Sequence, residues 1–289
     1  MLNKTNLHQY QRNVLEKAKQ KPNLGLFMEP GLGKTVTALT IIEESPKGAT
    51  LVIAPKRVAE SVWAQECANW KHLSSMKVGK IMGSPSQRLK VLQSSLDVYV
   101  INVENVTWLI DNWIDNKFQY LIVDESSRFK DPSTKRFKAL KKVLKQFQRR
   151  IILTGTPTPQ GYADLWAQVG LLDLGERLET SITRFREKYM YVAEKNRHTG
   201  VVYKWALNTG ADKLINSRIS DICFSLLAED YLELPSLSNL YHRISFDNDI
   251  RAKYNELKKH MVAQVGKEEI TAPTAATLTN KLLQFTSGA

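Results

Sequence analysis

The residues with the clearest chemistry are the segment Gly31 to Thr35 (GLGKT), which follows an apolar run from Leu24 to Met28. A bound phosphate needs backbone N–H groups at a helix N-terminus, a lysine and a hydroxyl for magnesium. Because Lys34 and Thr35 supply the last two, the pattern predicts a phosphate-binding loop. The strict GxxxxGK(S/T) pattern would place Gly at position 28, where this chain has Met28. A glycine-rich turn before an ordinary helix is the alternative.

A second pair of reactive side chains, Asp124 and Glu125, ends the apolar run Tyr120 to Val123. In a phosphate-loop enzyme the Asp holds Mg²⁺, and the adjacent Glu orients and deprotonates the attacking water. We therefore expect Thr35 and Asp124 at the metal, and Lys34, Asp124 and Glu125 in catalysis. Standing alone, the acid pair would more often be a solvated turn.

A third apolar run, Ile151 to Leu153, ends in Thr154, Gly155 and Thr156. Ligands of open α/β sheets bind along the carboxyl edge of the strands, where these hydroxyls would lie. We expect Thr154 and Thr156 to hydrogen-bond to the acidic pair and to sense the γ-phosphate. A Gly-Thr-Pro turn without such a role is the alternative.

The elements that must position these residues follow a βαβ rhythm. Apolar runs without clean alternation indicate parallel strands covered by helices on both faces, so the predicted fold is α/β. The runs are Leu24 to Met28, Thr50 to Ala54, Val98 to Asn102, Tyr120 to Val123 and Ile151 to Leu153. An amphipathic helix is expected over Ser133 to Gln148, and its lysines form either a solvated face or part of a basic nucleic-acid surface.

After Leu172 the rhythm stops. The segment Glu176 to Leu232 is predicted to be mainly helical, with a hairpin tip around Asn196 to Gly200. A domain boundary is expected near Pro235. Beyond it, the pattern predicts a strand over Leu240 to Phe246 and a helix over Asp249 to Val265.

The composition narrows the class of protein. The 289 residues include 41 Lys and Arg against 29 Asp and Glu, a net charge of +12, which favours a polyanionic partner: nucleic acid, or less so an anionic membrane. Only Cys67 and Cys223 are present, without metal-ligand spacing, so neither a disulfide framework nor a zinc cluster is expected. Because no signal peptide or membrane span is visible, we expect a cytoplasmic protein.

Taken together, these motifs resemble the first RecA-like lobe of superfamily-two helicase-like ATPases, most closely Swi/Snf-type DNA translocases. The resemblance covers most of the chain, and six motifs occur in the family's order. They are Leu7 to Gln11, Met28 to Thr35, Leu51 to Lys56, Val100 to Glu104, Asp124 to Ser127 and Leu153 to Pro157.

The resemblance implies ATP and Mg²⁺ as cofactors and DNA, preferably double-stranded, as partner. It implies that Gln11 recognises adenine, with Pro30, Gly31, Leu32, Gly33, Lys34 and Thr35 around the phosphates. It further implies that Thr154, Gly155 and Thr156 couple hydrolysis to motion, and that Pro55, Lys56 and Arg57 contact nucleic acid. The implied domains are a RecA-like lobe over 1–175, a helical protrusion over 176–234 and the beginning of a second lobe over 235–289.

Three departures from the family's pattern matter. Ser127 stands where many relatives carry His, and Pro30 lacks a backbone N–H that a phosphate can use. The chain also stops near Ala289, before the arginine-containing motif of a second lobe. The expectation is that it binds ATP weakly and hydrolyses it slowly, with the missing second RecA-like lobe as a partner. The compact motif spacing fits a phage or bacterial member, and a monomer is favoured.

The competing interpretation is a non-enzymatic nucleic-acid binding module with a relic phosphate loop. Its stacking surfaces would be six tryptophans, although core packing is the better explanation for most of them. They are Trp63, Trp70, Trp108, Trp113, Trp166 and Trp205. Nucleotide dependence distinguishes the two, because a plain binder should be indifferent to Lys34→Ala.

Overall fold

The computed structural model describes residues 1–196, 199–231, 240–242, 244–260, 262–265, 268–271 and 275–287. The chain forms two compact units, Met1–Leu234 and Pro235–Ala289. Each unit is described by itself.

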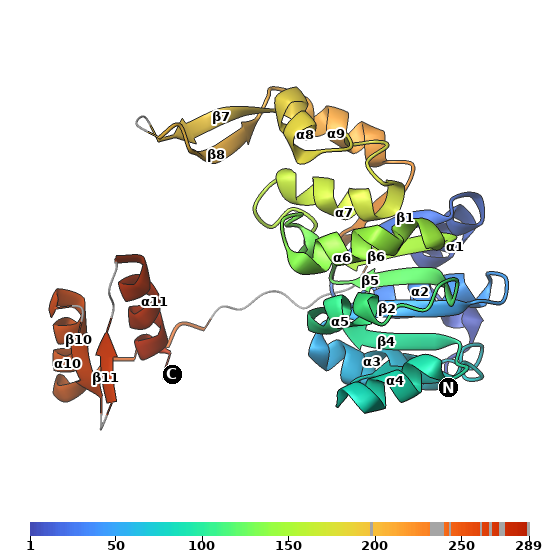
Figure 1. Ribbon diagram of the computed structural model, residues 1–289, viewed down its shortest axis with the longest axis horizontal. Coiled ribbons are helices and arrows are strands. Elements are labelled where there is room, and N and C mark those ends of the chain that lie inside the picture. The colour runs from blue at the N-terminus through green and yellow to red at the C-terminus, as the bar shows by residue number, and fades with distance from the viewer. Residues whose placement is uncertain are drawn as a thin grey trace. The chain divides into compact units, whose positions relative to one another are not determined.

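Seven parallel strands form the sheet of the first unit, in the order β3-β4-β2-β5-β6-β1-β9 (Figure 1). The predicted α/β fold with a parallel sheet is confirmed, and all five predicted strands are present. The sequence analysis missed β3 and β9. The strands are β1 (Asn23–Met28), β2 (Ala49–Ala54), β3 (Val78–Ile81), β4 (Val98–Asn102), β5 (Phe118–Asp124), β6 (Arg149–Thr154) and β9 (Cys223–Leu226).

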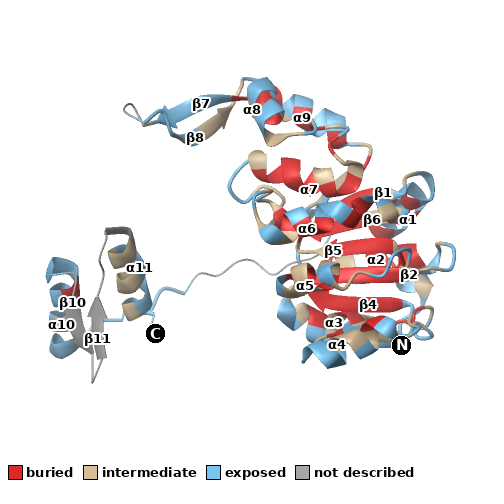
Figure 2. Ribbon diagram, in the orientation of Figure 1, coloured by how far each residue is buried: buried red, intermediate tan, exposed pale blue. Residues whose placement is uncertain are grey.

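Helices cover both faces of this sheet, because alternate side chains of each strand enter different cores. In β2, Leu51 and Ile53 pack with α5, α6 and α7, whereas Val52 and Ala54 pack with α1, α2 and α3. Figure 2 shows the central strands as almost entirely buried. The helices are α1 (Gln9–Gln20), α2 (Lys34–Glu43), α3 (Lys56–Asn69), α4 (Pro85–Gln93), α5 (Val106–Asp111), α6 (Lys135–Val143), α7 (Ala163–Asp173), α8 (Ile182–Tyr189) and α9 (Ala211–Ile219).

The helix expected over Ser133 to Gln148 is shorter in the structure. It is α6, capped by Thr134, whose Oγ1 accepts from the backbone N–H of Phe137 at 3.4 Å. A 3-10 turn, Leu144–Gln146, follows it. Its apolar face is buried and most of its lysines are exposed, as the predicted amphipathic pattern requires.

The segment 176–234 is not the mainly helical protrusion that the sequence predicts. It contains α8 and α9, but also an antiparallel hairpin of β7 (Met190–Lys195) and β8 (Val202–Leu207), whose predicted tip near Asn196 is present. Strand β9 pairs with β1 and so belongs to the main sheet. A four-residue strand gains its hydrogen bonds from a partner about 200 positions away, which local periodicity does not reveal.

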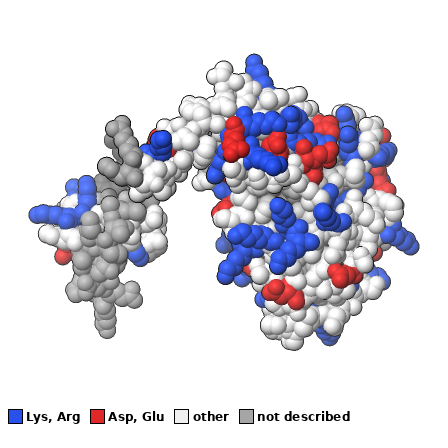
Figure 3. Space-filling view, turned by 45° about the horizontal axis from the view of Figure 1, so that its top comes forward, with Lys and Arg blue, Asp and Glu red and all other residues white. Residues whose placement is uncertain are grey.

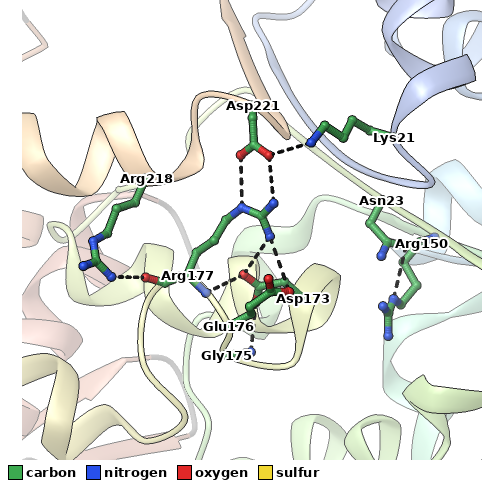
Figure 4. A network of polar contacts seen from close by, with 9 residues as sticks. All are labelled: Lys21, Asn23, Arg150, Asp173, Gly175, Glu176, Arg177, Arg218 and Asp221. Carbon is green, nitrogen blue, oxygen red and sulfur yellow. Dashed lines mark hydrogen bonds and ion pairs between the residues drawn. The ribbon is translucent and has the colours of Figure 1, made fainter.

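An ion-pair network fixes the connection between α9 and β9 (Figure 4). Arg177 donates two hydrogen bonds to the Asp221 carboxylate, at 3.0 and 2.8 Å, and lies 3.5 Å from Asp173. Lys21, just after α1, donates to the same carboxylate at 3.0 Å. This bidentate pair lowers the pKa of Asp221 to about 2.

The second unit contains α10 (Asn248–His260), β10 (Val262–Val265), β11 (Glu268–Thr271) and α11 (Ala275–Thr286). Two predictions are wrong here. Residues 240–242 and 244–246 form no strand, and the helix expected over Asp249 to Val265 ends at His260, because 262–265 pair with β11 as β10. Among the helices that the structure describes in either unit, none is both long and apolar enough for a membrane span.

Candidate functional site

The strand order brings the predicted motifs together. The sheet contains the neighbours β2, β5, β6 and β1, and because all are parallel, their carboxyl ends meet at one edge. The loop after β1 begins at Glu29, β6 ends at Thr154, β5 ends at Asp124 and β2 leads into Pro55. Four segments that are distant in sequence therefore share the edge where ligands of such sheets bind.

The loop after β1 has the backbone geometry of a tight turn into a helix. Gly31 and Gly33 have φ of 88° and 69°, in the left-handed region, and Gly33 is the N-cap of α2. A Cβ on Gly33 would lie 2.5 Å from Gln11 Nε2, so both the backbone and the space require glycine. Met28 is fully buried as the last residue of β1. The non-glycine at position 28 therefore lies in the core and outside the turn.

Lys34 sits at the start of α2 and points back over the loop. Its Nζ donates to the carbonyl oxygens of Met28 and Glu29, at 2.6 and 3.1 Å. Burial lowers the Lys34 pKa, and the charges of Asp124, Glu125 and Glu29 oppose that shift. Thr35 follows in the first turn of α2. This is a half-buried cation near two acids, and within the described part of the chain its hydrogen bonds go to neutral carbonyls.

Gln11 lies against the same loop from α1. Its Nε2 donates to Thr37 Oγ1 at 3.2 Å and, at longer range, to the carbonyls of Leu32 and Gly33, while its Oε1 accepts from the His8 backbone N–H at 2.8 Å. Both ends of the amide are thus engaged by the protein. A cavity of about 640 Å³ opens beside Gln11. Its lining includes His8, Tyr10, Gly31, Gly33 and Trp70.

Asp124 is a partly buried acid at the end of β5. Burial raises its pKa to about 6, although the indole N–H of Trp63 donates to Asp124 Oδ2 at 3.2 Å and lowers it in part. Mg²⁺ is bound in such sites through one or two carboxylates together with phosphates and waters. A partly buried carboxylate with one indole donor fits that donor set, and so does the Thr35 hydroxyl in the first turn of α2.

Glu125 is held by two hydroxyls. The Thr154 hydroxyl donates to its Oε1 at 2.7 Å and the Ser127 hydroxyl donates to the same oxygen at 2.5 Å. The predicted contact of Thr154 with the acidic pair is therefore present. For Thr156 the expectation is wrong in form: its backbone N–H donates to Thr154 Oγ1 at 3.1 Å, and among the described residues its hydroxyl bonds to neither acid. Glu125 itself adopts a left-handed φ of 53°.

Gly155 lets two of these loops touch. A Cβ there would lie 3.2 Å from Pro30 Cδ, which is closer than most real contacts of that kind. The glycine therefore keeps the end of β6 against the loop after β1.

Sequence reasoning missed a buried bridge behind the acids. The Ser126 hydroxyl donates to Gln168 Oε1 at 2.7 Å, and Gln168 Nε2 donates to the carbonyls of Pro157 and Asp164, at 2.6 and 2.9 Å. Gln168 is fully buried on α7. The available signal was a lone Gln within the apolar run Leu165 to Leu172, since a buried amide needs partners. Trp63, expected from the sequence as a core or stacking residue, also donates to Asp124.

The predicted nucleic-acid residues lie at the same edge. Pro55 is the N-cap of α3, and Lys56 and Arg57 are exposed in its first turn. Within the described residues neither makes an ion pair, whereas Arg128 lies 3.7 Å from Glu104 and Lys130 lies 3.5 Å from Asp164. Figure 3 shows Lys and Arg gathered on one face of the first unit, with Asp and Glu among them.

The tryptophans belong mainly to the core, as the sequence predicts. Trp63, Trp70 and Trp166 are buried. Trp108, Trp113 and Trp205 are partly buried and pack against the core on the α5–α7 side. Stacking surfaces for nucleic acid must therefore be sought elsewhere than in most of these rings.

Comparison with known proteins gives a consistent family. The family model described as the SNF2-related domain matches residues 8–287. The chain is 32% identical over 293 residues to protein p41 of Acyrthosiphon pisum secondary endosymbiont phage 1, covering 97% of this chain and 63% of that protein. It is 30% identical over 171 residues to the ATP-dependent helicase BRM of Arabidopsis thaliana, covering 55% of this chain and 8% of that helicase.

Among solved structures, the Sulfolobus solfataricus SWI2/SNF2 ATPase core in complex with dsDNA shares the fold, with a TM-score of 0.62 and 21% identity. The match covers 98% of this chain and 58% of that one. The chain thus spans less than two thirds of these relatives.

Proposed function

The chain belongs to the SNF2-related domain family, and we propose that its first unit binds ATP with Mg²⁺ at the carboxyl edge of the sheet. The observation that carries this proposal is the convergence there of the GLGKT turn, Lys34 and two acids, with Thr154 bonded to Glu125. The carbonyl oxygens of Met28 and Glu29, which bond Lys34 Nζ in the described structure, carry no formal charge. The phosphates of ATP would supply the negative charge opposite Lys34.

In this proposal each residue has a distinct task. The turn Gly31 to Gly33 presents backbone N–H groups to the phosphates and Lys34 contacts the terminal ones. Thr35 and Asp124 would hold Mg²⁺, which supplies charge neutralisation on the phosphate oxygens when bound. Glu125, oriented by Thr154 and Ser127, accepts a proton from the attacking water.

Gln11 has two roles in the proposal. It faces the cavity beside Gly31 and Gly33, where an adenine can lie. Because its amide already bonds Thr37 and the loop carbonyls, reading the base requires some of these hydrogen bonds to be exchanged. We infer that base recognition and the shape of the phosphate loop are linked through this side chain.

We further propose that the whole protein couples ATP hydrolysis to movement along double-stranded DNA. Lys56 and Arg57 support this, since they are exposed cations at the same edge as the nucleotide site. Contacts from such cations to phosphates position a protein on nucleic acid without reading its sequence. The net charge of +12 predicts that binding weakens strongly as salt rises.

The test compares the wild type with Lys34→Ala and with a matched control, Lys90→Ala, which removes an exposed lysine from α4. Binding of a non-hydrolysable ATP analogue with Mg²⁺ is measured by calorimetry, and ATP hydrolysis is measured with and without duplex DNA. Losing a charge-assisted hydrogen bond costs about 1.5–3 kcal/mol, so Lys34→Ala should weaken analogue binding by roughly 10- to 150-fold. Lys90→Ala should leave binding unchanged.

A different result separates the proposal from the binding-module interpretation. If the wild type binds duplex DNA but binds no nucleotide, and Lys34→Ala changes neither, the phosphate loop is a relic.

A further inference from the structure

The β7–β8 hairpin exposes aromatic side chains on a strand pair that stands apart from the main sheet. Its strands pair only with each other, and Figure 1 shows it extending past α8 and α9. Tyr203 is 66% exposed and Tyr191 is 53% exposed. Val192 and Val201 are exposed as well. Exposed tyrosine rings on a strand pair outside the main sheet are available for contact with another molecule.

Contacts with α8 and with a buried tyrosine fix the base of the hairpin, so its exposed side chains have a defined direction. The backbone N–H of Asn208 donates to the carbonyl of Tyr189 at 2.9 Å, and Tyr189 is fully buried. The guanidinium of Arg186 lies over the Trp205 ring, 5.3 Å from its centroid. Isolated two-stranded hairpins are only marginally stable in water, and these contacts supply the support that the strands lack.

The hairpin is regular near its base and irregular near Tyr203. Side chains alternate along a strand, so Trp205 lies on one face of β8 and Ala206 on the other, and Tyr191, which pairs with Ala206, shares the face of Ala206. Further along, the register shifts on both sides of Glu194, and the second shift falls at Tyr203. We call the exposed surface formed by Tyr203 the aromatic face.

The hairpin and the helix before it carry an excess of cations. Over Arg184 to Lys204 the described residues include five Lys or Arg and two Glu, although Lys188 is paired with Glu179 outside this range. Glu194 is paired with Lys204 at 3.3 Å, which offsets its charge. Arg184 and Lys195 are exposed, and neither makes an ion pair within the part of the chain that the structure describes. A partner that offers flat apolar rings and negative charge together matches this surface, and nucleotides have that chemistry.

We propose that the aromatic face is an accessory nucleic-acid contact on which an unpaired base stacks against Tyr203, with Lys195, which pairs with the neighbouring Val202, close to the phosphates. An unpaired base is required, because in a duplex the faces of the bases are covered by their neighbours. The inference rests on the proposed function only in taking DNA as the partner. It adds a site outside the carboxyl edge and a preference for single strands or strand junctions.

The test measures fluorescence anisotropy of a labelled single-stranded oligonucleotide and of a duplex of equal length, with the full chain and no ATP. The variant is Tyr203→Ala, and the matched control is Tyr191→Ala, which removes an exposed tyrosine near the base of β7. Stacking of one base contributes about 1–3 kcal/mol, so Tyr203→Ala should weaken single-strand binding by roughly 5- to 150-fold. Duplex binding should stay within about twofold for both variants.

Tyr203→Phe distinguishes the ring from the hydroxyl, which accepts a hydrogen bond from Asn196 Nδ2 at 2.8 Å. It should keep wild-type affinity for the single strand. Equal losses on single strand and duplex would overturn the stacking assignment, as would unchanged single-strand binding by Tyr203→Ala, the result expected if the face binds a protein. Because the assay contains no ATP, these outcomes do not depend on whether the proposed ATP binding holds.

Discussion

Replacing Asp124 with Asn should stabilise the first unit while abolishing Mg²⁺-dependent hydrolysis. Asp124 lies at the end of β5, and burial raises its pKa from an ordinary 3.8 to about 6. Because the pKa of Asp124 is higher in the folded state, the protonated carboxyl favours folding. This contribution to the free energy of unfolding is fully present below pH 3.8 and is lost as the pH rises through about 6. The charged form therefore destabilises the folded state at neutral pH.

The size of this effect follows from the shift. A pKa unit corresponds to about 1.4 kcal/mol, so the charge on Asp124 should cost about 3 kcal/mol at pH 8 and about half of that at pH 5. The amide of Asp124→Asn carries no charge at either pH, and its oxygen can still accept from Trp63. We expect the variant to be more stable than the wild type by these amounts, with the difference narrowing on acidification.

The assay is urea unfolding followed by tryptophan fluorescence at pH 5 and pH 8. All six tryptophans lie before residue 234, so the signal reports on the first unit. The matched control is Asp131→Asn, because hydrogen bonds from Ser133 lower the pKa of Asp131; that change should be neutral or slightly destabilising. A stability gain for Asp124→Asn that does not change with pH, or a loss of stability, would refute the electrostatic argument.

Three further outcomes follow from particular contacts. Gly33→Ala should lower the free energy of unfolding by about 1–2 kcal/mol from its φ of 69° alone, and it should impair analogue binding in calorimetry. Adding Gln11→Ser to this variant should restore only the part of the stability loss that comes from a Cβ 2.5 Å from Gln11 Nε2. Ser127→Ala should lower kcat by roughly 2- to 10-fold at unchanged KM, because the hydroxyl acts through Glu125, and Ser127→Thr should recover the rate. Arg177→Met should lower the urea midpoint of the first unit, since it removes both hydrogen bonds to Asp221; an unchanged midpoint would show that the network is not needed for stability.

The residues of the candidate site were predictable because each motif is local. The GLGKT turn, the acids after Val123 and the Thr154 turn each follow a run of apolar residues, and the end of such a run in the sequence predicts the end of a strand. The same apolar runs, which lack clean alternation, also predict that helices cover both faces of the sheet. Met28 departs from the strict loop pattern at a position that belongs to the strand and not to the turn.

What depended on contacts between distant residues could not be read from the chain. Strand β9 exists through its pairing with β1, and β10 through its pairing with β11, so both were assigned to other structures or missed. The donor from Trp63 to Asp124, the bridge through Gln168 and the engagement of Gln11 by Thr37 likewise join separate elements. Local sequence determines which side chains can do chemistry, but their hydrogen-bond partners and pKa values arise only when folding brings distant elements together and removes water from between them.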